Sequence, residues 1–265
     1  MATKHYENGI IGSTEGGYAD FSSDIFTTGT VFWVSSVTGN DANAGTNRTA
    51  PKATLDSALT AAVASNGDII FLESGHSETL SSAITFSEAG IIVVGLGSGT
   101  NKPRFTVNAA IDGFSIAANL VELYNLRFPI GTTTANTSRI NVGGAGVKIY
   151  DCDFLCGAND LETITIPDAG DHAEISGCSF TISADGADSA IRIESASNFG
   201  VNIFGCTFDG GSFDFDDAAL YSTVAHTDYL YRNNILTNKA SIIHTAAATG
   251  RCTGTVAGDG SRVQI

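Results

Sequence analysis

The chain has 265 residues, of which 43% are hydrophobic, so it is apolar enough for one packed domain and too apolar for a disordered protein. Its formal net charge of −15 at pH 7 argues against nucleic acid as a partner, because phosphate binding requires clustered Lys and Arg. No stretch approaches the about 20 apolar residues of a membrane span, and the start MATKHYENGIIGSTEGG lacks the apolar core of a secretion signal. We therefore expect no membrane partner and synthesis in a reducing cytoplasm.

Residues 1–30 are polar and rich in Gly, Ser and Thr, with isolated apolar side chains. Such a segment cannot form a core of its own, so we predict an N-terminal arm that lies along another surface. We expect the attachment contacts of this arm to come from Tyr6, Ile10, Ile11, Tyr18 and Phe21.

Residues 31–67 are predicted to form a strand, a loop and a capping helix. VFWVSSV (31–37) is typical of a strand, and a turn-rich stretch follows it. From Thr54 to Ser65 the apolar residues recur at helical spacing, which predicts an amphipathic helix that ends at Asn66-Gly67. Placed before the first repeat, this helix would cap the open end of a repetitive structure.

Residues 68–250 contain a repeated phrase. Its five clearest copies are VELYNLRF, VKIYDCDF, AEISGCSF, VNIFGCTF and YLYRNNIL, starting at Val121, Val147, Ala173, Val201 and Tyr229. The starts lie 26, 26, 28 and 28 residues apart, and each copy alternates apolar and polar residues before a turn. A second short apolar strand precedes each copy. Strands repeating at this period, with no helical pattern between them, predict a parallel β-solenoid in which each coil stacks on the last.

Equivalent positions of the repeats carry the same kinds of residue. Because stacked strands lie about 4.8 Å apart, we expect two interior columns. One column holds the thiols Cys152, Cys178 and Cys206, and the other holds the rings Phe128, Phe154, Phe180 and Phe208. An odd total of five cysteines, three of them in one column, favours reduced core side chains over disulfides or a zinc site.

The sequence thus predicts an all-β protein, a right-handed parallel β-helix of about seven coils with an N-terminal capping α-helix. Residues 251–265 carry no further repeat and are predicted to be a tail or a second cap.

The run VSSVTGNDANAGTNRTAPKATLDSALTAAVASNGDIIFLESGHSETL resembles the N-terminal section of right-handed parallel β-helix proteins of the pectate-lyase-like group. Members of that group open with a strand, an N-G-N-D-x-N-x-G loop, a P-x-A-T helix and a G-D-x-I-x-L strand. The resemblance covers residues 31–250 and implies the fold, but the architecture serves lyases, hydrolases, adhesins and viral spikes alike. The short format with one polar arm is similar to virion proteins of tailed phages, which implies a decoration or spike component. Related β-helices pack around a threefold axis, which implies a homotrimer.

The many acidic residues of the chain are the candidates for catalytic groups. Lyases of this group use Ca²⁺ held by acidic residues and an Arg or Lys base. The basic residues of the repeats are scattered, and no two of them recur at one slot of adjacent coils: Arg127, Lys148, Arg192 and Arg232. A glycosidase needs two carboxylates at a defined separation, for which Asp151 with Asp153, or Asp185 facing Asp214, are candidates. The histidines fall in different repeat positions and are interpreted as structural. No cofactor, metal site or catalytic set is predicted.

We therefore predict a non-enzymatic structural protein of a phage virion, a capsid decoration (cement) protein on the outer head surface. Its partners would be the major capsid protein or another virion protein and further copies of itself. The alternatives are a tail spike or fibre that cleaves host polysaccharide, and an adhesin that binds a host surface glycan without cleaving it.

Overall fold

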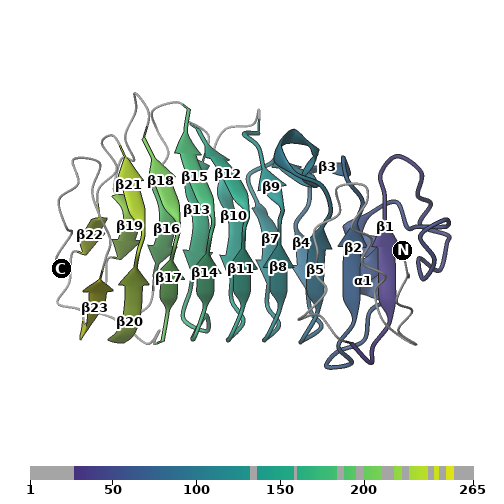
Figure 1. Ribbon diagram of the computed structural model, residues 1–265, viewed down its shortest axis with the longest axis horizontal. Helices are drawn as coiled ribbons and strands as arrows, with labels where there is room; N and C mark the ends of the chain where they lie inside the picture. The colour runs from purple at the N-terminus through teal and green to yellow at the C-terminus, as the bar shows by residue number, and fades with distance from the viewer. Residues whose placement is uncertain are drawn as a thin grey trace, which may run out of the picture.

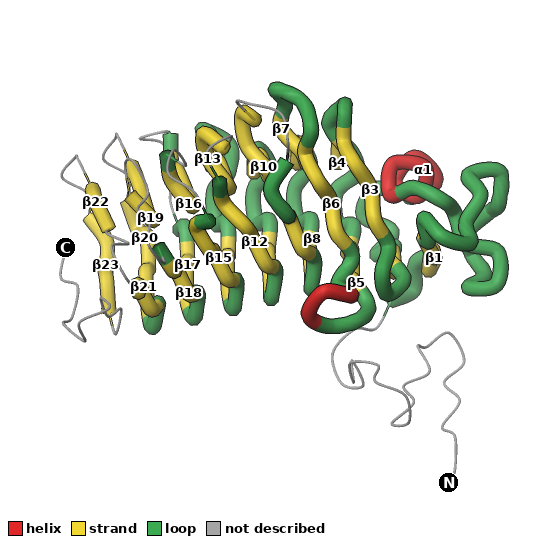
Figure 2. The backbone as a smooth tube through the Cα atoms, turned by 90° about the horizontal axis from the view of Figure 1, so that it is seen from above, coloured by secondary structure: helices red, strands yellow, loops and turns green. Residues whose placement is uncertain are grey.

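The computed structural model describes residues 27–131, 136–157, 160–183, 188–194, 200–210, 218–222, 227–237, 242–244 and 249–253. Within these ranges the chain winds into an elongated parallel β-solenoid (Figures 1 and 2), which confirms the predicted all-β parallel β-helix. The five apolar residues predicted to attach the arm lie outside the described residues.

Three sheets run along the solenoid, and every pair of neighbouring strands is parallel. Sheet 1 contains, in spatial order, β1 (Val31–Val34), β2 (Ile69–Leu72), β5 (Ile92–Gly95), β8 (Glu122–Tyr124), β11 (Lys148–Tyr150), β14 (Glu174–Ser176), β17 (Asn202–Phe204), β20 (Thr227–Arg232) and β23 (Thr249–Thr253). Sheet 2 contains β3 (Ser77–Leu80), β6 (Arg104–Val107), β9 (Arg127–Phe128), β12 (Asp153–Cys156), β15 (Ser179–Ile182), β18 (Thr207–Asp209) and β21 (Ile235–Thr237). Sheet 3 contains β4 (Ile84–Phe86), β7 (Asp112–Ile116), β10 (Asn136–Val142), β13 (Asp160–Ile166), β16 (Ser189–Ile193), β19 (Ala218–Ser222) and β22 (Ile242–His244).

Each turn of the solenoid gives one strand to each sheet, in the order sheet 1, sheet 2, sheet 3. The repeated phrase forms the strand of sheet 1, the corner and the strand of sheet 2, and the preceding apolar strand belongs to sheet 3. The findings support a solenoid of about five turns, so the expected number of about seven coils stays a prediction.

The corner between sheets 1 and 2 is a single residue with left-handed backbone. It is Asn125, Asp151, Gly177, Gly205 and Asn233 in successive coils, with φ of 58°, 54°, 63°, 64° and 53°. Glycine adopts this conformation freely, and the short polar side chains of Asn and Asp tolerate it. The corner therefore has the same length in each of these coils, which keeps equivalent residues in register.

The interior contains the two columns of side chains. Cys152, Cys178 and Cys206 are buried and carry free thiols, in line with Leu126 below and Asn234 above. Burial raises the pKa of the Cys178 thiol, and hydrogen bonds with the neighbouring thiols raise it further, so this thiol is neutral. At the end of the column, the Asn234 carbonyl oxygen accepts from the Cys206 backbone N–H at 3.0 Å, and the Asn234 amide donates to the Ile203 carbonyl at 2.9 Å.

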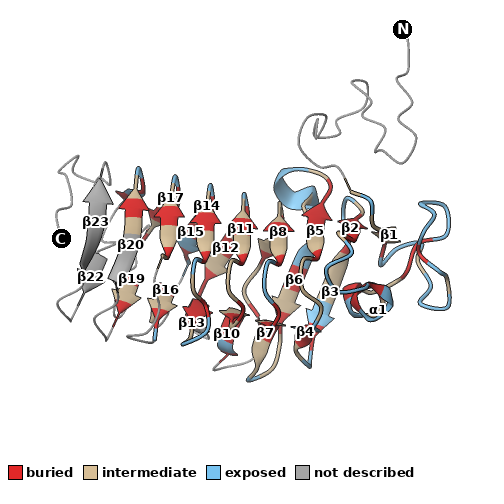
Figure 3. Ribbon diagram, turned by 90° about the horizontal axis from the view of Figure 1, so that it is seen from below, coloured by how far each residue is buried: buried red, intermediate tan, exposed pale blue. Residues whose placement is uncertain are grey.

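The phenylalanine column is a continuous stack of rings. Ring centroids from Phe128 to Phe154, Phe154 to Phe180 and Phe180 to Phe208 lie 5.0, 4.8 and 4.9 Å apart, with interplanar angles of 7°, 8° and 6°. All four rings are fully buried. Figure 3 shows buried residues along the strands of all three sheets, which matches an interior filled by side chains. Burial of each such ring contributes about 1.5–3 kcal/mol.

A short 3₁₀ helix, η1 (Gly99–Asn101), lies between β5 and β6, and one α-helix, α1 (Leu55–Ala61), precedes β2. The sequence predicted a helix to Ser65, but α1 ends earlier. Thr54 caps its start, accepting from the Ser57 N–H at 3.2 Å. At its end the Val63 N–H donates to the buried Asp68 carboxylate at 2.8 Å instead of continuing the helix. Asp68 also accepts from the Thr30 N–H at 2.6 Å and so joins the end of α1 to the start of β1.

Candidate functional site

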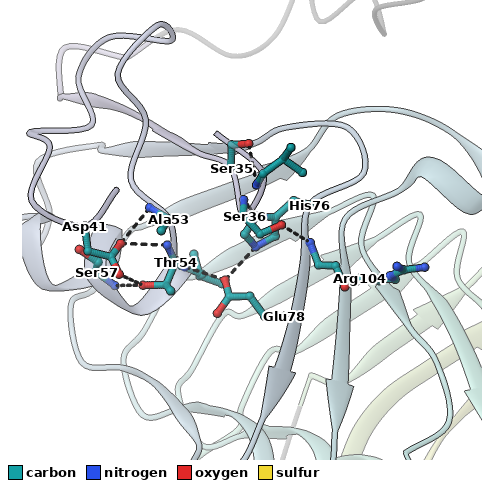
Figure 4. A network of polar contacts seen from close by, with 12 residues as sticks. Ser35, Ser36, Asp41, Ala53, Thr54, Ser57, His76, Glu78 and Arg104 are labelled. Carbon is teal, nitrogen blue, oxygen red and sulfur yellow. Dashed lines mark hydrogen bonds and ion pairs between the residues drawn. The ribbon is translucent and has the colours of Figure 1, made fainter. Parts of the chain in front are cut away.

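The N-terminal end of the solenoid is held by a polar junction (Figure 4). The buried His76 ring accepts from the Ser36 N–H through Nδ1 at 2.9 Å, so its own N–H lies on Nε2 and donates to Glu78 at 2.8 Å. The same Glu78 oxygen accepts from the Leu55 N–H at 2.8 Å. This junction ties together the segment after β1, the start of α1 and β3, and it gives His76 the structural role that was predicted from its isolated position.

Asp41 anchors the loop after β1 to the start of α1. Its carboxylate accepts from the Ala53 and Thr54 N–H groups at 2.9 and 3.0 Å and from the Thr54 hydroxyl at 3.1 Å. Partial burial raises the pKa of Asp41, but these hydrogen bonds outweigh it and hold the pKa below its usual value. Across the described ranges, no group of three or more His, Cys, Asp or Glu side chains is placed to hold a metal ion.

An apolar cluster lies on the outer face of sheet 1 at its N-terminal end. Alternate residues of a strand face opposite sides, so Ile70 and Leu72 enter the interior while Ile69 and Phe71 face outward. This outer cluster, as we call it, consists of Ile69, Phe71, Val94 and Leu96, with the partly buried Val31, Trp33, Ile92 and Tyr124 packed against them. The Trp33 and Phe71 rings stack with centroids 5.0 Å apart.

Sequence reasoning missed this cluster. Its signal is the unbroken apolar run of β2, IIFL, in which all four residues are buried. A strand that is apolar on both faces is covered on both faces, whereas the later strands of sheet 1 alternate polar and apolar residues.

A basic pair lies on the outer face of sheet 2. Arg104 of β6 and Arg127 of β9 are partners in the parallel register. Arg104 was not among the basic residues compared from the sequence, so this pair was not predicted. The two arginines line a shallow hollow of about 410 Å³, whose other lining residues are Ser77, Thr79, Thr100, Thr106 and Pro129.

The acidic candidates are only partly brought together. Asp151 is an exposed corner residue, and its backbone carbonyl accepts from the Lys102 ammonium at 2.7 Å. Asp153 forms an ion pair with the same ammonium at 3.1 Å. Asp185 and Asp214 lie outside the described residues. Of this first candidate pair, the Asp153 carboxylate is thus neutralised by a lysine.

A second set of carboxylates, which was not among the candidates predicted from the sequence, lies on the outer face of sheet 3. Asp112 accepts from the Ser138 hydroxyl at 2.8 Å and from the Asn141 amide at 2.9 Å. Glu162, two strands away, pairs with Arg192. Burial raises the pKa of Glu162 above its usual value, although Arg192 opposes the shift.

No protein-family model matches this sequence, and a comparison with curated proteins gives no match. Solved structures share the fold. The crystal structure of pectate lyase Pel9A is 16% identical, with a TM-score of 0.51 over 93% of this chain and 76% of that chain. The pectin methylesterase from Aspergillus niger is 14% identical, with a TM-score of 0.50 over 86% of both chains. At this level of identity the likeness shows the parallel β-helix fold alone.

Proposed function

We propose that the protein is a non-enzymatic structural protein of a phage virion, a decoration protein attached to the outer surface of the capsid. The outer cluster on sheet 1 is the observation that carries the proposal. Its four central residues are buried within the chain, but the apolar residues around them, Val31, Trp33, Ile92 and Tyr124, are only partly buried, and an exposed apolar patch marks a contact with another protein. Trp33 is partly exposed at this end of the solenoid.

Attachment therefore uses one end of the solenoid. The partly exposed members of the outer cluster, together with apolar residues of the 1–30 arm, contact the major capsid protein or another virion protein. The remaining length of the solenoid projects from the particle. We also propose that the protein forms a homotrimer through a lateral face. Because each copy carries a net charge of −15, copies repel one another except where apolar surfaces meet.

Particle binding tests the proposal. Purified full-length chain is added to capsids that lack it, and the retained protein is measured after gradient sedimentation. A chain without residues 1–26 and a Trp33→Ala variant are expected to lose most of their occupancy. Val37→Ala is the matched control, because Val37 is 79% exposed and is not a member of the outer cluster. Wild-type occupancy for both the truncated chain and Trp33→Ala, with unchanged circular dichroism, would exclude this mode of attachment.

The finer description of the fold is also a proposal. We propose a right-handed helix of about seven coils over residues 68–250, with β1 and α1 in residues 31–67 closing its N-terminal end. The closing role is supported by Leu55, Ala58 and Leu59 of α1, which join the main interior cluster.

A polysaccharide-cleaving spike is the second candidate, and the carboxylates of sheet 3 are the observation in its favour. A carboxyl group with a raised pKa can donate a proton to a leaving oxygen, and Glu162 is of this kind. The test is release of reducing ends from capsular polysaccharides and polygalacturonate, with and without Ca²⁺, by the wild type and by Glu162→Gln. Absence of products from every substrate, or equal activity of both proteins, would dismiss Glu162 as a catalytic acid.

A further inference from the structure

We propose that further copies of this chain dock on the outer face of sheet 1 between β8 and β20, with the axes of the solenoids parallel. This names the lateral face of the homotrimer proposed above and rests on that part of the proposed function. The contact lies beyond the N-terminal end that is proposed to meet the capsid.

Two columns of outward side chains run along this part of sheet 1. The parallel register aligns the residues of neighbouring strands, and alternate residues of each strand face outward. Every one of these side chains is partly exposed. We call them the aromatic face: one column holds Tyr124, Tyr150, Ser176, Phe204 and Arg232, and the other holds Glu122, Lys148, Glu174, Asn202 and Leu230.

Aromatic side chains gather on this side of the solenoid. The ring centroids of Tyr124 and Tyr150 lie 5.0 Å apart, and the Arg232 guanidinium lies 4.5 Å from the centre of the Phe204 ring. Within the described strands, the outer face of sheet 2 carries no Phe, Tyr or Trp, and that of sheet 3 carries Tyr221 alone. Tyrosine, phenylalanine and arginine are enriched where proteins contact one another.

The charges of the aromatic face cancel. Glu122 accepts from the Lys148 ammonium at 2.8 Å, and Glu174 accepts from the Tyr150 hydroxyl. Burial and the neighbouring carboxylates raise the pKa of Tyr150, so its hydroxyl stays a neutral donor. Arg232 supplies the second positive charge, so the two carboxylates are balanced while the whole chain carries −15. Copies that repel one another elsewhere can therefore approach here.

The two columns suit the same face of another copy at the same height. Rotation about a line parallel to the solenoid axis places each column opposite the other column of the next copy, strand by strand. Tyr150 then faces Lys148 of the other copy, and Phe204 faces its Asn202. At each of these levels at most one of the two columns carries a charged residue, so no charge meets a like charge across the contact.

The shape of the face also favours another copy as the partner. Figure 1 shows β8, β11, β14, β17 and β20 side by side along the solenoid. Neighbouring strands are about 4.8 Å apart, and a copy has the same rise per coil, so the two faces stay in register along their whole length. Parallel axes also bring all N-terminal ends to one end of the assembly, as attachment to a capsid requires.

Sedimentation velocity of the whole chain, without capsids, tests the contact. We expect the mass to rise with concentration from the 27.3 kDa of one chain to that of a discrete oligomer. Salt should strengthen the association, because it screens the repulsion between acidic copies. A dimer or a trimer supports the contact, and a dimer would exclude the homotrimer while leaving capsid attachment standing.

Substitutions at Tyr150 test both the face and the parallel arrangement. Tyr150→Arg places a positive charge opposite Lys148 of the other copy and should weaken association by about tenfold or more. Tyr150→Glu places a negative charge there and should associate more strongly than Tyr150→Arg, although it adds to the net charge of −15. General repulsion between acidic copies predicts the opposite order.

Thr181→Arg and Thr181→Glu are the matched controls, because Thr181 is exposed on the outer face of sheet 2 in β15. Both should associate within about twofold of the wild type, since exposed sites away from a contact carry little binding energy. Phe204→Ala removes a ring from the aromatic face without a change of charge and should also weaken association. It keeps the test decisive if circular dichroism shows that a charge at position 150 prevents folding.

A wild-type chain that sediments as a monomer at every concentration would overturn the proposal. So would wild-type association of both Tyr150→Arg and Phe204→Ala, which would place the contact elsewhere, or weaker association of Tyr150→Glu than of Tyr150→Arg. A monomer would leave capsid attachment through the N-terminal end untouched, and loss of capsid binding would leave the contact between copies untouched.

Discussion

Replacing Phe154 with leucine tests whether the stacked interior rings stabilise the solenoid beyond their burial. Phe154 is fully buried, with parallel rings 5.0 Å away on one side and 4.8 Å on the other. Leucine keeps most of the apolar volume and leaves a small cavity, which costs about 1 kcal/mol. Loss of two stacked pairs costs about 1 kcal/mol each. We therefore expect the free energy of unfolding to fall by about 3 kcal/mol.

A double-mutant cycle separates stacking from burial. The adjacent pair Phe154→Leu and Phe180→Leu should show a coupling energy of about 0.5–1.5 kcal/mol, because the two rings touch. Phe154→Leu with Phe86→Leu is the matched distant pair, since Phe86 is equally buried but packs on Phe114 in β7. β4 and β12 belong to coils three steps apart, about 14 Å along the axis, so the coupling should stay within about 0.5 kcal/mol of zero.

Urea unfolding followed by circular dichroism supplies the free energies, and unchanged slopes across the variants make them comparable. If the adjacent pair couples no more strongly than the distant pair, the column contributes by burial alone and the stacking argument is refuted.

Three further substitutions have defined outcomes. Asp41→Asn should lower the free energy of unfolding by about 0.5 kcal/mol at pH 7, since an exposed capping carboxylate is partly screened. Because the folded pKa of Asp41 lies below the ordinary 3.8, this stabilisation is lost as the pH falls through the folded pKa. The urea midpoints of the wild type and the variant should therefore differ less at pH 3 than at pH 7. The pKa of Glu162 is raised in the folded state, so its pH dependence is opposite to that of Asp41: its contribution to stability is present below the ordinary pKa of 4.5 and is lost as the pH rises. Glu162→Gln should therefore flatten the decline of the melting temperature above that pH. An unaltered profile of melting temperature against pH would contradict this. Asn234→Ala leaves the buried Cys206 N–H without a partner and should cost about 1–3 kcal/mol, with faster hydrogen exchange at the Cys206 amide. Protected exchange would show that another group replaces the side-chain oxygen of Asn234.

The parts of the fold that repeat could be predicted from the sequence. The copies of the repeated phrase have the same spacing between their apolar residues. Because the one-residue corner fixes the register, this spacing places Cys152 over Cys178 and Phe154 over Phe180. The apolar segments before each copy become the strands of sheet 3 for the same reason. Period-two alternation shows which residues face inward, and the repeat shows which of them are neighbours.

The first coils could not be predicted as fully, since insertions break the pattern there. η1 and Pro103 separate β5 from β6, so Arg104 does not stand at the spacing that the later copies share, and its pairing with Arg127 is visible only in the structure. The end of α1 was misplaced because the helical pattern continues to Ser65, while the carboxylate of Asp68, just beyond the pattern, takes the N–H of Val63. The spacing of apolar residues carries no signal for such a hydrogen bond.

Because the corner between sheets 1 and 2 has the same length in successive coils, the solenoid can be lengthened in equal steps. Residues 121–146 form one full 26-residue period, so a tandem copy inserted after Gly146 would continue every ladder and every interior column without a change of register. Each added period lengthens the rod by about 4.8 Å. The distance between an anchor at the amino-terminal end and a group displayed at the far end can therefore be adjusted in fixed steps, by duplication or loss of whole periods, while the packing of the existing ones stays as it is.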